Sequence, residues 1–135
     1  MSTTNAPNGS ADVAETIDAD TVADVTPVRI EASELASTAP SYLRDLKAGL
    51  AAEGRQPAVV TVETCFDEDC QLATQAVADD VRGVVRAAAF LGAARVDVTV
   101  TDAADEDAAR AALRAVEERG RREGVAVDIS GTLSR

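Results

Sequence analysis

Hydrophobic residues alternate with polar residues in four short segments of this chain, and they recur at helical spacing in the three segments between them. The alternating segments are residues 28–32, 58–64, 95–101 and 125–130. The intervening segments are residues 40–54, 69–91 and 105–123. A period of two indicates a strand with one buried face, and a period near 3.6 indicates an amphipathic helix. The sequence therefore predicts the order strand, helix, strand, helix, strand, helix, strand.

The polar side of these strands predicts the architecture. Strands that are covered on both faces read as continuous apolar runs, whereas here charged residues and threonines alternate with the valines. These polar positions are Arg29, Glu31, Thr61, Glu63, Asp97, Thr99, Thr101 and Asp128. We therefore expect an α/β two-layer sandwich whose four-stranded sheet has helices mainly on one face. A ferredoxin-like α+β fold and a small three-layer wound sheet are the alternatives.

Three helices are more than such a sheet needs. Four strands span about 15–19 Å, and helices about 10 Å across cover that width two at a time. We expect the long middle helix either to lie at the edge of the layer or to take part in a dimer.

Residues 1–26 differ in composition from the rest of the chain. They contain no basic residue, few apolar residues, and the acidic residues Asp12, Glu15, Asp18, Asp20 and Asp24. Segments of this kind remain solvated because they bury too little apolar surface to offset the entropy of ordering. We expect a disordered acidic tail over residues 1–26 and a single α/β domain over residues 27–135.

The whole chain is acidic, with 24 Asp and Glu against 13 Lys and Arg, a net charge of -11, one lysine (Lys47) and no histidine. This composition resembles that of cytoplasmic proteins from salt-accumulating archaea, because molar salt shortens the Debye length to about 3 Å and screens self-repulsion. It disfavours binding to nucleic acid, whose phosphates are neutralised by Lys and Arg. The sequence has no apolar run of membrane-spanning length and no secretion signal at its start. We expect a halophilic cytoplasmic protein that contacts neither nucleic acid nor membranes.

Two cysteines, Cys65 and Cys70, lie where the second strand gives way to a helix. A helix N-terminus favours a thiolate, whereas the three acidic residues 67–69 disfavour one. The structural interpretation is that one cysteine packs in the core and the acids cap the helix. Two functional alternatives are a reversible Cys65–Cys70 disulfide and a metal site made by two cysteine pairs in a symmetric dimer. Because one chain supplies two thiols and no imidazole, the sequence predicts no metal and no cofactor.

No motif of an enzyme is present. The chain lacks the glycine-rich nucleotide loops and the nucleophile elbow, and without histidine the commonest general base is absent.

Acidic and basic residues spaced four apart in residues 106–122 indicate a solvated helix face. None of the outward strand positions is aromatic, so we expect the uncovered sheet face to bind a protein partner or a second copy. The sequence thus predicts a non-catalytic interaction domain, with a thiol-based redox or metal-handling protein as the alternative.

Overall fold

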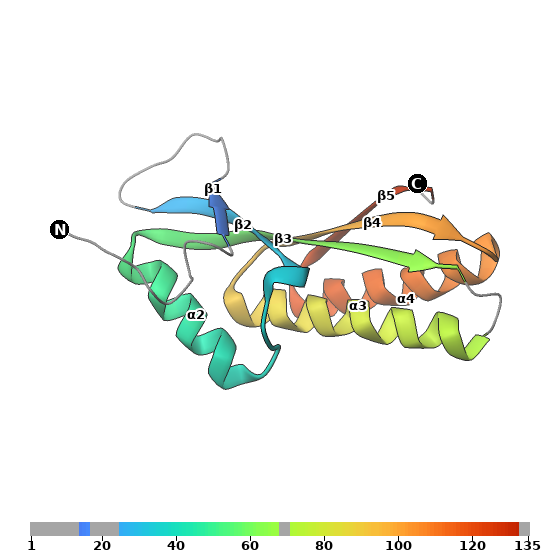
Figure 1. Ribbon diagram of the computed structural model, residues 1–135, viewed down its shortest axis with the longest axis horizontal. Helices are drawn as coiled ribbons and strands as arrows, with labels where there is room; N and C mark the ends of the chain where they lie inside the picture. Colours follow the sequence, from blue (N-terminus) through green and yellow to red (C-terminus); the bar gives the residue numbers. More distant parts are fainter. Residues whose placement is uncertain (1–13, 17–24, 68–70, 133–135) are drawn as a thin grey trace.

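The computed structural model describes residues 14–16, 25–67 and 71–132 of the chain (Figure 1). The strands are β1 (Ala14–Thr16), β2 (Thr26–Glu31), β3 (Arg55–Phe66), β4 (Arg95–Ala103) and β5 (Ala126–Gly131). The helices are the short 3-10 helix η1 (Ala32–Glu34) and the α-helices α2 (Pro40–Ala52), α3 (Gln71–Leu91) and α4 (Glu106–Glu123). The predicted alternation of strands and helices is confirmed.

The four predicted strands form an all-parallel layer in chain order. Strand β2 pairs with β3, β3 with β4, and β4 with β5. Connections between parallel neighbours are right-handed, so steps that all proceed in one direction place every helix on the same face. Figure 1 shows α2, α3 and α4 together on one side of the sheet. The predicted two-layer α/β sandwich is confirmed, and the ferredoxin-like and three-layer alternatives are wrong.

A further strand, β1, extends the sheet at the β2 edge. It pairs antiparallel with β2, with Ala14 opposite Ile30 and Thr16 opposite Val28. Residues 14–16 fall within the segment predicted to be a disordered tail. The remaining residues of that segment before Val25 lie outside the described part of the chain, so the predicted boundary at residue 26 stays a prediction.

The hydrophobic core lies between the helices and the valine face of the sheet. Its strand side chains are fully buried: Val28, Ile30, Val60, Val96, Val98 and Val100. The helices contribute Leu43, Leu50, Val81, Val85, Leu91, Leu113 and Val116. Each such side chain stabilises the fold by roughly 1.5–3 kcal/mol relative to an exposed one. A core built almost without aromatic residues is therefore sufficient, because many small branched side chains share one face.

Helix α3 lies in the middle of the helical layer, where it packs against α2, α4 and β3. The expectation that it lies at the edge is wrong. The reason is the length of β3, whose 12 residues span about 40 Å. Helix α2 lies below the start of this strand, and α3 and α4 lie below the rest (Figure 1). The three helices are therefore distributed along the strands as well as across them.

Helix α4 lies close to β5 because of Gly120. A Cβ atom at this position would lie 2.6 Å from the Val125 carbonyl oxygen and 2.7 Å from Cγ2 of Val127. Both distances are shorter than van der Waals contact, so only glycine fits without moving one of the elements. Asp105 caps the start of this helix by accepting a hydrogen bond from the Ala108 backbone N–H at 3.1 Å.

We predict that Gly120→Ala lowers the free energy of unfolding by about 1–3 kcal/mol, because the methyl group forces α4 away from β5. The matched control is Gly83→Ala in α3, where an added Cβ meets nothing within 4 Å. This control should instead gain about 0.5–1 kcal/mol from its higher helix propensity. Urea denaturation at fixed salt measures both changes. Equal effects at the two glycines would contradict the close packing.

Candidate interaction surface on the open sheet face

The eight polar residues predicted to share a face do lie on the side of the sheet away from the helices, which we call the open face. Strand side chains alternate, so residues next to the buried valines 60, 96 and 98 point away from the helices. The pairing register places Glu31, Thr61, Asp97 and Asp128 in one row across the strands and Glu63 opposite Thr99 in the next. All eight residues are exposed or half-buried. They are Arg29, Glu31, Thr61, Glu63, Asp97, Thr99, Thr101 and Asp128.

One row of the open face is rich in carboxylates. Glu31 lies opposite Thr61, Thr61 opposite Asp97, and Asp97 opposite Asp128. Carboxylates directly opposite each other on neighbouring strands repel. Arg95 partly relieves this repulsion. Its Nε donates to Oδ1 of Asp97 at 2.7 Å, and its Nη2 donates to Oδ2 of Asp97 at 3.2 Å.

Three carboxylates of the open face lack such a partner. Within the described residues, no ion pair is formed by Glu31, Glu63 or Asp128. Their charge faces solvent on a surface that no described helix covers. The sequence analysis missed Arg95, although its position two residues before Asp97 on the same strand face was a usable signal.

Hydroxyl groups connect the strands near the carboxyl ends of β4 and β5. Thr101 donates a hydrogen bond to the Thr64 carbonyl at 3.3 Å, and Thr132 donates one to the Thr101 carbonyl at 3.2 Å. Oγ1 of Thr99 lies 3.5 Å from Oγ of Ser130. These contacts hold the hydroxyl groups in place. A surface of small polar groups suits hydrogen bonding better than stacking of nucleic-acid bases.

Of the two cysteines, Cys65 lies in the described part of the chain. Cys65 is a free, half-buried cysteine that lines a small cavity of about 70 Å³ at the end of β3, together with Phe66 and Thr74. Cys70 lies outside the described residues, so the disulfide and metal hypotheses stay predictions. In the described part of the chain, no three His, Cys, Asp or Glu residues are grouped closely enough to hold a metal ion.

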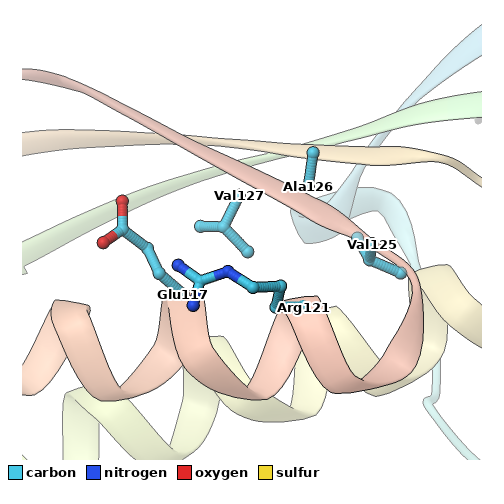
Figure 2. A pocket seen from close by; sticks show the side chains of 5 residues that line it. All are labelled: Glu117, Arg121, Val125, Ala126 and Val127. Atoms are coloured by element: carbon cyan, nitrogen blue, oxygen red, sulfur yellow. The ribbon is translucent and has the colours of Figure 1, made fainter.

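A second hollow lies below β5 and was not foreseen from the sequence. Its volume is about 240 Å³, and it is lined by Glu117 and Arg121 of α4 and by residues 125–127. Figure 2 shows the two charged side chains on the flank of α4, directly below the strand. We call this hollow the β5 groove. It arises because β5 is the last strand of the sheet and nothing described lies beyond it.

A protein-family model described as "Domain of unknown function (DUF8564)" matches residues 24–129, which is most of the chain. The chain belongs to this family. No curated protein matches the sequence significantly. None of the helices in the described ranges is long and apolar enough to cross a membrane.

Among solved structures, the chain is similar to the crystal structure of a xylose isomerase domain protein from Planctomyces limnophilus, an α/β fold of the TIM-barrel type. The TM-score is 0.58 at 12% sequence identity. The match covers 76% of this chain and 43% of the other, so this chain spans less than half the length of that protein. At this identity the likeness shows the fold alone.

We predict that Asp128→Asn raises the free energy of unfolding by about 0.2–1 kcal/mol at low ionic strength, because it removes a carboxylate that lies opposite Asp97. Chemical denaturation at low protein concentration measures the change. The gain should shrink in molar salt, where charges are screened. Asp45→Asn, on the exposed side of α2, is the control for a general reduction of net charge. An equal gain at Asp45 would contradict a specific cross-strand repulsion.

Proposed function

We propose that this chain is a non-catalytic protein-interaction domain that binds through its open face, in the cytoplasm of a salt-adapted organism. The observation that supports it best is the set of carboxylates Glu31, Glu63 and Asp128, which face solvent without an ion pair in the described residues. They stand on a regular sheet surface, where the backbone holds them at fixed spacing. A rigid array of charges is suited to recognition of a complementary surface.

The charge of the open face favours a basic protein surface as partner. Only Arg29 and Arg95 oppose its four carboxylates, and Arg95 already pairs with Asp97. Nucleic acids and anionic lipid surfaces carry the same sign of charge as the face and are repelled. Lysine and arginine side chains of a partner would relieve the repulsion between neighbouring carboxylates and form hydrogen bonds with them.

The sizes of the β5 groove and the Cys65 cavity do not favour a small-molecule site at either place. The β5 groove and the Cys65 cavity, of about 240 and 70 Å³, are smaller than the roughly 300–1,000 Å³ of ordinary small-molecule sites. The open face is broad and carries exposed polar groups, which suits contact with another macromolecule.

The test is affinity purification from the organism that encodes the chain, followed by quantitative mass spectrometry. We expect the triple variant Glu31→Gln, Glu63→Gln and Asp128→Asn to lose a protein that the native chain retains. Each substitution keeps the side-chain shape and removes one charge of the open face, so the loss should exceed tenfold for a partner held by these charges.

The matched control is a second triple variant, Glu34→Gln, Asp45→Asn and Asp80→Asn, which removes the same charge from exposed positions on the helical side. It should retain the partner. If both variants retain the same proteins, or lose them equally, the open face is not the binding surface. Light scattering of all three proteins reports whether the retained partner is a second copy.

The proposed habitat predicts that salt stabilises the fold. Raising KCl from about 0.1 M to about 2 M shortens the Debye length from about 10 Å to a few ångströms and screens the net charge of -11. We expect the midpoint of thermal unfolding, followed by circular dichroism, to rise over this range. Sorbitol at equal osmolarity, which does not screen charge, should give a smaller rise. A fold equally stable at both salt concentrations would contradict adaptation to salt.

A further inference from the structure

The two edges of the sheet differ in how their backbone groups are used. At one edge, β1 pairs with residues 28–30 of β2. At the other edge, the Ala126 N–H donates to the carbonyl of Ala94, the residue before β4, at 2.9 Å. Because backbone groups alternate in direction along a strand, those of Val127 and Ile129 point out of the sheet. Within the described residues no strand pairs with them, and such an edge is a template for another strand.

We propose that a second copy of this chain adds to the β5 edge in antiparallel orientation, around a twofold axis that passes through Ile129. The two sheets then form one continuous sheet with all helices on the same side, and the two open faces become one wider surface. This inference concerns a different part of the molecule from the proposed binding surface and does not depend on it.

The register follows from the strand itself. In an antiparallel pair, opposite residues must both direct their backbone groups toward the partner strand, so the twofold axis passes through a residue and not between two. Centres at residue 127, 128 or 129 keep both Val127 and Ile129 opposite residues 125–131 of the second copy. A centre at Asp128 places this carboxylate opposite its own copy. A centre at Val127 places Ile129 opposite residue 125, before the start of β5. A centre at Ile129 avoids both, and it places Asp128 opposite the hydroxyl of Ser130 in the second copy.

The position of α4 relative to β5 shows which residues of α4 lie next to the twofold axis through Ile129. Gly120 contacts Val125 and Val127, so it lies level with the start of β5. Ile129 is about 10 Å further along the strand. Helix α4 runs in the opposite direction and rises about 1.5 Å per residue, so the axis passes close to Leu113 and Arg114.

The charges on α4 are self-complementary about a twofold axis at Leu113 and Arg114. Glu106, Arg110, Glu117 and Arg121 follow one another at spacings of four, seven and four residues, which places them on one side of the helix. Glu117 and Arg121 line the β5 groove, so this side of α4 faces the unpaired edge (Figure 2). A twofold axis between residues 113 and 114 brings Glu106 opposite Arg121, and Arg110 opposite Glu117, of the second copy.

The charges on α4 also disfavour a centre at Val127. This centre moves the axis to between residues 117 and 118 of α4. Arg114 then meets Arg121, and Glu117 meets Glu118, so like charges face each other. With the centre at Ile129, Arg114 lies near the axis and faces Arg114 of the second copy. This contact is repulsive, whereas the contacts of Glu106, Arg110, Glu117 and Arg121 are attractive. Strand register and helix charge thus select the same axis by separate arguments.

The test is sedimentation equilibrium of the full chain at concentrations up to about 1 mM, which detects the weak association expected of a small interface. We expect a monomer–dimer equilibrium. Val127→Pro removes an outward N–H that pairs with no strand among the described residues, and it should abolish the dimer. Circular dichroism should show that the fold remains.

Charge reversal tests the register. Glu106→Arg and Arg121→Glu should each weaken the dimer by about tenfold, since each turns two attractive contacts into repulsive ones. The double variant should restore native affinity. Within one chain the two positions are about 22 Å apart along α4, so they can compensate only between copies. Asp80→Arg, on the exposed side of α3, makes the same change in net charge as Glu106→Arg and should leave the dimer unchanged.

A chain that stays monomeric at about 1 mM overturns the proposal, because even a weak edge interface would populate dimers at that concentration. A dimer that Val127→Pro leaves intact also overturns it and indicates association through another surface. A double charge variant that is no tighter than the single variants overturns the proposed register.

Discussion

The structure depends on burial of one face of a parallel sheet and not the other. Parallel strands are usually covered on both faces, whereas β2, β3 and β4 bury their valines on one side and carry charges and threonines on the other. Because consecutive right-handed connections all proceed in one direction, the three helices cover the valine face together. The same constraint that forms the core therefore creates the open face, and the two cannot be altered independently.

Much of this fold could be predicted from the sequence because the period of hydrophobic residues is unusually regular. Val96, Val98 and Val100 alternate strictly with polar residues, and all three are buried. The polar neighbours of the valines lie on the open face as expected, since a strand has only two faces. Helix α4 begins and ends where Asp105 and Gly124 indicate, because a capping carboxylate and a glycine with positive φ are strong local signals.

The features that the sequence did not indicate all depend on which segments become neighbours. The central position of α3 depends on the length of β3, and the β5 groove depends on strand order. Ion pairs on α4 connect Arg119 with Glu123 and Arg121 with Glu118, because long side chains choose among several neighbours once the fold is formed. The role of Cys65 likewise depends on surroundings that a sequence pattern does not specify.

The likeness to a TIM-type fold allows the open face to be compared with the inner face of a barrel. Four sequential parallel strands with helices outside them resemble half of an eight-stranded barrel, whose inner face is filled with bulky side chains. Here that face carries Glu63, Asp97 and Asp128, and burying such charges costs several kcal/mol for each ion. Strand β1 also covers the β2 edge that the next parallel strand of a barrel would need. Both the charges and the covered edge disfavour closure of the layer, so the surface that a barrel encloses faces solvent here.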